Sequence, residues 1–218
     1  MGIQERKERE RERRRQQIIV AAKRVFSQKG FNRTTMEDIA KEAELSPGTL
    51  YLYFKNKDEL YASLTLRVLQ YLHIRMEHVN AEQQLSSSER LQALKDAMYD
   101  VYEFDPLILI NMFHLQSSEA LKNLSVELIG EIKRLSSSAL ESMAKVFRRG
   151  IAEEVIVDIQ PIALADILWA LFSGIVLWEE SKRIIDPSKD FLKQTLDLAF
   201  DIFMRGLRRD RQADPPNQ

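Results

Sequence analysis

Residues 46–57, SPGTLYLYFKNK, bring hydroxyl, aromatic and amine groups into one short stretch of the chain. Gly48 and Thr49 are small, which suits a helix whose backbone must come close to a partner. Thr49 adds a hydroxyl, while Tyr53 and Lys57 add a phenol and an amine that can contact phosphate oxygens. These are the chemical requirements of a helix that lies in the major groove of DNA.

Two short helices and a tight turn are expected to position this stretch. Thr35 can cap a first short helix, with Asp38 three residues later as a variant capping box. Ser46 can cap a second helix, which Pro47 would begin and which we expect to end near residue 54. A longer helix precedes both and ends at Gly30. This arrangement predicts a three-helix unit of helix-turn-helix type.

The charge of the chain is unevenly distributed. Residues 1–57 hold 14 lysines and arginines against 8 acidic residues, a net charge of +6, whereas the remainder holds 18 against 25, a net charge of −7. A basic first quarter on an acidic body indicates that the first quarter meets a polyanion. Residues 5–15, ERKERERERRR, are interpreted as a solvated helix extension or a loose arm.

The rest of the chain is predicted to be helical, which gives an all-α protein of about nine helices. Residues 81–88 are polar and are expected to link an N-terminal head, residues 12–72, to a larger helical body, residues 80–210. Helical periodicity and breaker residues predict further helices at about 57–78, 91–104, 107–116, 119–151, 161–183 and 189–207, with a loop at 155–161.

Several functional classes find no support in the sequence. There is no cysteine, and the three histidines lack the spacing of metal ligands, so we expect neither a metal nor another cofactor. No phosphate-binding loop, nucleophile elbow, zinc-protease or dinucleotide motif is present, which argues against an enzyme. The charged N-terminus does not match an export signal, so a cytoplasmic location is expected. The apolar run 162–178 contains Asp166, and we interpret it as a buried core helix rather than a membrane span.

Residues 18–60, IIVAAKRVFSQKGFNRTTMEDIAKEAELSPGTLYLYFKNKDEL, resemble the TetR family of bacterial transcriptional regulators. The positions that carry the resemblance are Phe26 and Gly30, Thr34-Thr35 ahead of Ile39-Ala40, and Gly48-Thr49-Leu50-Tyr51 leading to Phe54, Lys57 and Leu60. The resemblance covers the first third of the chain, and beyond it only the helical architecture fits.

The resemblance implies a homodimer with two DNA-binding heads and a ligand-binding body. By position, Thr35 and Met36 would lie against the DNA backbone, and Tyr53 and Lys57 would hold phosphates. The residues at or near bases would be Ser46, Pro47, Gly48, Thr49 and Tyr51. Pro47 departs from the polar or basic residue common at its place, so specificity would rely on thymine methyls and DNA shape. Packing of Tyr51 and Tyr53 against the fourth helix, and a role for Lys57 as a surface residue at a helix start, remain alternatives.

The resemblance also implies an effector site in the body and a dimer interface in the last two helices. Candidate effector contacts are Met98, Tyr99, Tyr102, Phe113, His114, Met143, Phe147 and Trp169. Candidate interface residues are Phe172, Ile175, Leu196, Ala199 and Phe203. All of these side chains have core spacing as well, so plain core packing is the competing interpretation.

Two functions therefore compete. The first is a homodimeric repressor that a small, largely apolar effector releases from a pseudo-palindromic operator in double-stranded DNA, with fatty acyl compounds as one candidate class. The second is a scaffold of the same fold that binds DNA and a protein partner but no small molecule. The second predicts a body that is filled by its own side chains.

Overall fold

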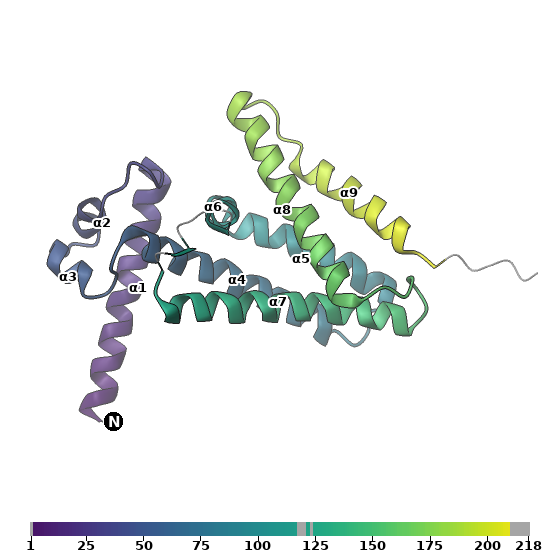
Figure 1. Cartoon of the computed structure of the whole chain (residues 1–218), viewed down its shortest axis with the longest axis horizontal. Coiled ribbons are helices and arrows are strands. Elements are labelled where there is room, and N and C mark those ends of the chain that lie inside the picture. The colour runs from purple at the N-terminus through teal and green to yellow at the C-terminus, as the bar shows by residue number, and fades with distance from the viewer. Residues whose placement is uncertain (1, 117–120, 123, 210–218) are drawn as a thin grey trace, which may run out of the picture. The chain divides into compact units, whose positions relative to one another are not determined.

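The computed structural model describes residues 2–116, 121–122 and 124–209, and within these ranges it is built from nine α-helices with no β-strand (Figure 1). The helices are α1 (Ile3–Lys29), α2 (Met36–Glu42), α3 (Pro47–Tyr51), α4 (Lys57–Ala81), α5 (Ser87–Phe104), α6 (Pro106–Gln116), α7 (Val126–Ala152), α8 (Pro161–Ile185) and α9 (Leu192–Leu207). The predicted all-α class is confirmed.

The helices belong to two compact units. One unit contains Met1–Val68 and Leu107–Lys133, and the other contains Leu69–Pro106 and Arg134–Gln218. Helices α1 to α3 and α6 thus lie in the first unit, while α5, α8 and α9 lie in the second. The expected domain boundaries, 12–72 and 80–210, stay a prediction, and they differ from the two units in that Leu107–Lys133 belongs to the first unit.

The first unit holds the predicted three-helix head. Its centre is formed by fully buried side chains from all three helices, among them Ile18, Ile39 and Leu50. The predicted capping box of α2 is present: the Thr35 hydroxyl accepts from Asp38 N at 3.1 Å, and Thr35 N donates to the Asp38 carboxylate at 3.1 Å. Lys29 pairs with the same carboxylate at 2.6 Å, so α1 and α2 are joined where the chain turns at Gly30.

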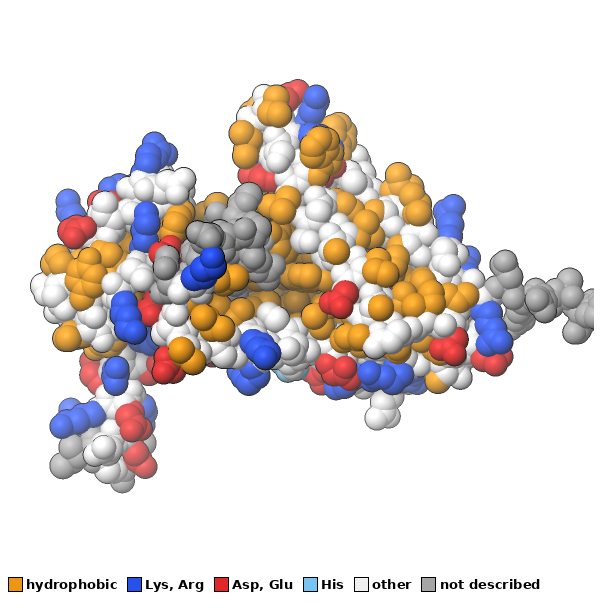
Figure 2. Space-filling view, viewed as in Figure 1, with side chains coloured by type: hydrophobic (Ala, Val, Ile, Leu, Met, Phe, Trp, Pro, Cys, Tyr) orange, Lys and Arg blue, Asp and Glu red, His pale blue; other side chains and the backbone are white. Residues whose placement is uncertain are grey.

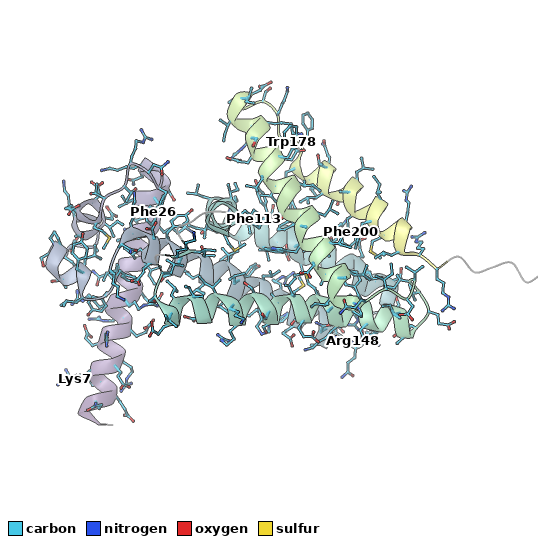
Figure 3. All side chains as sticks on the ribbon, in the orientation of Figure 1. Lys7, Phe26, Phe113, Arg148, Trp178 and Phe200 are labelled. Carbon is cyan, nitrogen blue, oxygen red and sulfur yellow. The ribbon has the colours of Figure 1, made fainter. Side chains whose placement is uncertain are left out.

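The charged N-terminal stretch is helical. Helix α1 begins at Ile3, and its first turns project from the head as an exposed helix with mixed blue and red side chains (Figure 2). Figure 3 labels Lys7 on this projecting part and Phe26 within the head. Of the two interpretations of residues 5–15, the helix extension is therefore confirmed.

The second unit begins its α5 helix earlier than the sequence analysis placed it. Ser86 caps the helix: its hydroxyl accepts from Glu89 N and lies within hydrogen-bond distance of the Glu89 carboxylate. Helix α5 therefore starts at Ser87 rather than near Leu91. Arg90 is 1% exposed, and its guanidinium donates to backbone carbonyl groups at the end of α4 and in the following turn. A buried arginine thus holds the α4–α5 corner through carbonyl acceptors.

Helix α8 is less buried than the sequence suggested. Only 28% of its most apolar window is buried within this chain, and two large side chains in this part of the helix, Ile167 and Trp178, are exposed. The expected core helix is therefore incorrect for a single chain. By length and composition alone α8 could also cross a membrane, a test that core helices pass as well.

The remaining helix boundaries differ in detail. Helix α3 ends at Tyr51 and continues as a turn toward Phe54. The expected start of the long seventh helix, Glu119, lies outside the described residues, and α7 itself begins at Val126.

Candidate nucleic-acid interface and ligand cavity

Helix α3 presents its first turn to solvent. The Ser46 hydroxyl accepts from Thr49 N at 3.1 Å and lies 2.9 Å from the Thr49 hydroxyl, which fixes the start of this five-residue helix. Pro47 and Gly48 are exposed, while Leu50 is fully buried and anchors the helix to the head. The helix therefore displays small and hydroxyl-bearing residues on a rigid base.

Gly48 has no structural need for its lack of a side chain. A Cβ atom at this position would meet only the Ser46 hydroxyl, at an ordinary distance of 3.8 Å. The open space above Gly48 is consistent with a partner that approaches the backbone closely.

Three bulky residues follow at the end of α3. Tyr51 is 49% exposed and Leu52 is 76% exposed, whereas Tyr53 is half-buried. Packing within the head therefore does not account for Tyr51. Leu52 was not among the candidate contacts, and its exposure marks it as an apolar group available to thymine methyls or sugars.

The two candidate residues at the start of α2 differ in what they can offer. Thr35 is exposed, and its hydroxyl accepts from Asp38 N at the start of α2, where a phosphate could also reach it. The Met36 side chain is only 7% exposed and packs in the head. Met36 can therefore contribute its backbone amide at the helix N-terminus, but not its thioether, to an anion.

Lys57 has a different environment from the one its sequence position suggested. Its amine donates to the carbonyl groups of Phe31, Asn32 and Thr34 at 3.1, 3.4 and 3.3 Å. It also lies 4.6 Å from the centre of the Phe31 ring. An ammonium group has three protons, and these carbonyls occupy them. In this arrangement Lys57 holds the α1–α2 loop, so its predicted phosphate contact loses its geometric support.

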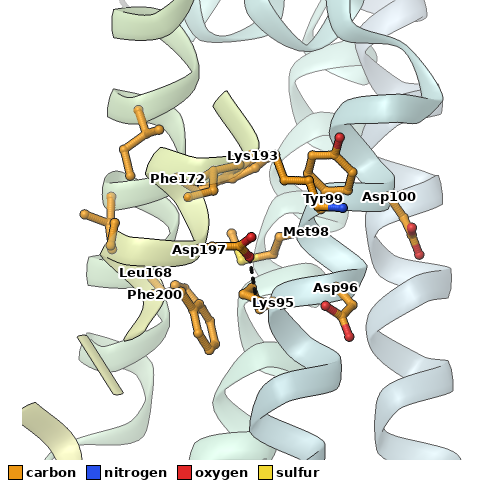
Figure 4. Close-up of a pocket in the computed structure, with 14 residues that line it drawn as sticks. Lys95, Asp96, Met98, Tyr99, Asp100, Leu168, Phe172, Lys193, Asp197 and Phe200 are labelled. Carbon is orange, nitrogen blue, oxygen red and sulfur yellow. Dashed lines mark hydrogen bonds and ion pairs between the residues drawn. The ribbon is translucent and has the colours of Figure 1, made fainter. Parts of the chain in front are cut away.

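The second unit contains a cavity of about 250 Å³ between α5, α8 and α9 (Figure 4). Its wall is mostly apolar, with contributions from all three helices. The lining residues are Lys95, Asp96, Met98, Tyr99, Asp100, Leu168, Leu171, Phe172, Ile175, Lys193, Leu196, Asp197, Ala199 and Phe200.

The polar groups of this cavity are largely paired with one another. Lys95 and Asp197 form an ion pair of 2.8 Å that joins α5 to α9 (Figure 4). The Lys193 amine lies 5.3 Å from the centre of the Tyr99 ring. Asp100 pairs with Arg75 of α4. The cavity thus combines an apolar wall with a polar edge on which most charged groups have a partner, a composition typical of small-molecule sites.

The structure assigns the candidate effector residues to several places. Met98 and Tyr99 line the cavity, whereas Tyr102 lies along neighbouring surface hollows. Trp169 packs on Phe172, with ring centres 5.7 Å apart, and does not line the cavity. The remaining candidates lie elsewhere: Met143 and Phe147 are fully buried core residues, Phe113 belongs to the first unit, and the side chain of His114 lies outside the described part.

The candidate interface residues point into their own chain. Four of the five, Phe172, Ile175, Leu196 and Ala199, line the cavity, and Phe203 packs against Phe147 with ring centres 6.1 Å apart. In a single chain these five side chains therefore lie on the inner side of α8 and α9, and their contact with a second chain stays a prediction.

The exposed side of the last two helices carries a different apolar set. Ile167 and Trp178 of α8 are 51% and 65% exposed, and Leu198 and Ile202 of α9 are 62% and 61% exposed. Ile167 and Trp178 are eleven residues apart and Leu198 and Ile202 four, so each pair lies on one face of its helix. We call these four residues the α8–α9 outer face.

Among the residues that the structure describes, no group of three or more histidine or acidic side chains could hold a metal ion.

Comparisons with known proteins agree with this geometry. Residues 18–64 match the family described as bacterial regulatory proteins of the tetR family. An HTH-type transcriptional regulator of Haemophilus influenzae is 34% identical over 109 residues, which spans 50% of this chain and 58% of that protein. A negative regulator of the biofilm operon of Staphylococcus aureus is 24% identical over 189 residues, or 86% of this chain and 97% of the relative.

Among solved structures, the regulator FadR from Bacillus subtilis, crystallised with stearoyl-CoA, aligns with a TM-score of 0.66 at 21% identity. The alignment covers 88% of this chain and 99% of the FadR chain. At this identity the likeness concerns the fold. The matched segment contains the α2–α3 unit described above, and the helical body follows the same architecture. Residues 18–64 therefore belong to the TetR family of bacterial regulatory proteins, and the chain as a whole has the fold of a TetR-family regulator.

Proposed function

We propose that this chain, a DNA-binding transcription regulator and not an enzyme by its family, is a homodimeric repressor. It holds a pseudo-palindromic operator with two α3 helices, and a small, largely apolar effector releases it. The observation that carries the proposal is the cavity of about 250 Å³ in a chain that also displays an exposed recognition helix. A relative named as a negative regulator supports repression.

The DNA contacts rest on exposure and available hydrogen-bond donors. Thr35, Thr49 and Tyr51 place hydroxyl groups on the open side of the head, and Gly48 leaves room for a close approach of the helix backbone. Since the Ser46 hydroxyl already serves the helix cap, its contribution to DNA is mainly through the fixed start of α3. Hydroxyls and small residues of this kind position a helix against phosphates and base edges.

The homodimer rests on the α8–α9 outer face. Four large apolar side chains, each more than half exposed, occur on two adjacent helices. Monomeric soluble proteins seldom leave such a set uncovered, and two helices from each of two chains can form a four-helix interface. A second copy of the chain would cover this face through a two-fold arrangement.

The effector class follows from the cavity wall. Met98, Leu168 and Phe172 offer an apolar surface, which suits an acyl chain or an aromatic compound. A solved relative crystallised with stearoyl-CoA supports the acyl class. The cavity is smaller than the about 300–1,000 Å³ of typical ligand sites. A long acyl chain would therefore have to part α5 from α9, where the Lys95–Asp197 pair now joins them.

A thermal-shift screen of acyl-CoA thioesters, free fatty acids and aromatic drugs tests the effector. A binding class should raise the melting temperature of the wild-type chain. Ala199→Phe fills the cavity and should abolish the shift in melting temperature. Ala152→Phe, at an exposed position at the end of α7, should retain that shift. If no compound class produces a shift and the Ala199→Phe variant represses like wild type, the scaffold function replaces this one.

A further inference from the structure

The projecting part of α1 has no evident task in the fold. Residues 2–13 are exposed wherever their side chains are described, and the core of the head begins at Ile18. The fourteen residues 2–15 form a rod of about 21 Å at 1.5 Å per residue. This rod contains seven lysines and arginines against four glutamates, a net charge of +3. Half of the net charge of +6 that residues 1–57 carry therefore lies outside the packed core of the head.

The arginines of the rod are arranged by face. Arg6, Arg9 and Arg13 are spaced i, i+3 and i+7, which places them on one side of the helix. The same stripe continues to Gln17 and Arg24, at i+11 and i+18 from Arg6.

The continuation of this stripe contacts α2. Gln17 donates to the carbonyl group of Ala43 at 3.0 Å, and Arg24 pairs with Glu42 at 3.3 Å. Ala43 is the C-cap of α2, and it lies three residues before Ser46, the N-cap of the recognition helix α3. The arginine stripe therefore leaves the head on the side that carries the helix-turn-helix.

The rod is held as a helix and not as a flexible tail. Glu10 pairs with Arg13 at 2.8 Å and with Arg14 at 4.0 Å, and the Glu5 carboxylate accepts from Gly2 N. Its base is fixed because Arg15 donates to Ser63 of α4 and lies over the Phe54 ring. The exposed ion pairs are weak and exchange readily for other anions. Arg13 can thus leave Glu10 for a phosphate without disturbing the core.

We propose that this rod, through Arg6, Arg9 and Arg13, binds phosphates of the duplex that flanks each operator half-site. The inference rests on the proposed DNA-binding function and adds a second contact region to the head. A length of about 21 Å exceeds the width of either DNA groove, so the rod can reach phosphates beyond those under α3. A membrane surface fits poorly, because residues 4–17 contain no apolar side chain.

The test compares two triple variants of the full chain. Arg6→Gln, Arg9→Gln and Arg13→Gln together remove the stripe, while Lys7→Gln, Arg11→Gln and Arg14→Gln remove the same charge from another face. The probe is a duplex selected from random sequence by the wild-type chain. It is used in a short form that ends at the half-sites and in a form extended by one helical turn at each end.

Extending the duplex should tighten wild-type binding by at least about tenfold and steepen the salt dependence by up to about five, since the two rods of a dimer offer six arginines and each phosphate contact contributes roughly 0.9 to the slope. The stripe variant should lose this gain and still bind the short duplex as wild type does. The control triple should keep most of the gain. Circular dichroism should report equal melting temperatures for all three proteins.

Other outcomes overturn the inference. If both triple variants lose the tighter binding to the longer duplex equally, the rod attracts DNA through its overall charge rather than through the stripe of Arg6, Arg9 and Arg13. If wild type gains nothing from the longer duplex, the rod does not reach flanking DNA, although binding of the short duplex would leave the regulator function intact. A wild-type chain that selects no duplex at all would contradict both proposals.

Discussion

Lys57 donates to three carbonyl groups inside the head, so its removal should first cost stability. We expect Lys57→Ala to lower the free energy of unfolding by about 1–3 kcal/mol, because two part-buried carbonyl acceptors and an exposed one lose their donor. Urea denaturation measures this change. Lys55→Ala, at an exposed side chain two residues earlier, should change it by less than about 0.5 kcal/mol. Equal stability of both variants would assign Lys57 a surface role.

Thr49 lies at the exposed start of α3 with its hydroxyl next to that of Ser46. Thr49→Ala removes this hydroxyl but keeps the bond from Thr49 N to Ser46, so the helix should remain capped. The variant should select a different preferred DNA sequence with an unchanged salt slope, whereas Thr49→Ser should keep the wild-type preference. A salt slope reduced by about one would instead make Thr49 a phosphate contact.

Residue roles set by near neighbours could be predicted from the sequence. The caps at Thr35 and Ser46 depend on partners three residues away, and both are present. The role of Lys57 depends on carbonyls 23 to 26 residues away, at positions that only the folded loop determines. Side-chain spacing carries no information about such distant acceptors.

At the scale of helices, a buried carboxylate joins α8 to α9. Glu179 is 5% exposed, and it accepts from Lys182 at 2.6 Å and from Thr195 of α9 at 2.7 Å. Burial alone would raise the pKa of Glu179, but these two hydrogen bonds outweigh it and leave the pKa below its ordinary value.

The lowered pKa of Glu179 makes the stability of the α8–α9 contact depend on pH. A carboxyl group with a pKa lower in the folded than in the unfolded chain stabilises the fold above its unfolded value, near 4.3. That stabilisation is lost as the pH falls through the folded pKa. We therefore expect Glu179→Gln to lower stability at neutral pH and to approach wild type in acid. Denaturation midpoints between pH 7 and pH 3 measure this.

A matched control is Glu141→Gln, since Glu141 pairs with Arg148 on the surface and both side chains are about half exposed. Its effect should stay below about 1 kcal/mol at every pH. A Glu179→Gln variant that behaves like this control would show that the buried carboxylate does not hold α8 to α9.

The sequence allowed us to predict that α8 and α9 are helices, but it did not allow us to predict which side of each helix is buried. The α8 and α9 patterns correctly predict two long helices, yet Phe172 and Leu196 face the cavity, while Trp178 and Leu198 face outward. A helix that is apolar nearly all round gives no signal that separates its inner side from its outer side. The cavity itself arises from three helices distant in sequence, which is why Lys95 and Asp197 were not among the candidates.

At the scale of the whole molecule, the outer face predicts the oligomeric state. Leu198→Glu with Ile202→Glu should leave one chain folded, because both positions are exposed in it, but should bury carboxylates in a dimer at a cost of several kcal/mol. Light scattering should then report a folded monomer. Ile129→Glu, at an exposed position of α7, should leave the wild-type mass unchanged. A double variant with the wild-type mass would move the interface elsewhere.

The central claim is that one chain couples DNA binding to an effector in the α5–α8–α9 cavity. A ligand can release DNA only if it favours a conformation that fits the operator less well. The coupling expected for allostery, about 1–3 kcal/mol, corresponds to a change of roughly 5- to 150-fold in operator affinity. Because linkage is reciprocal, operator DNA must weaken effector binding by the same factor.

The most direct test titrates the selected duplex against the full chain with and without a saturating screen hit, and titrates that compound with and without saturating duplex. We expect the compound to lower duplex affinity, and the duplex to lower compound affinity, by the same factor of about 5 to 150. In the Ala199→Phe variant neither affinity should change. A compound that binds in the cavity while operator affinity stays unchanged would contradict the claim that this protein is a ligand-responsive regulator.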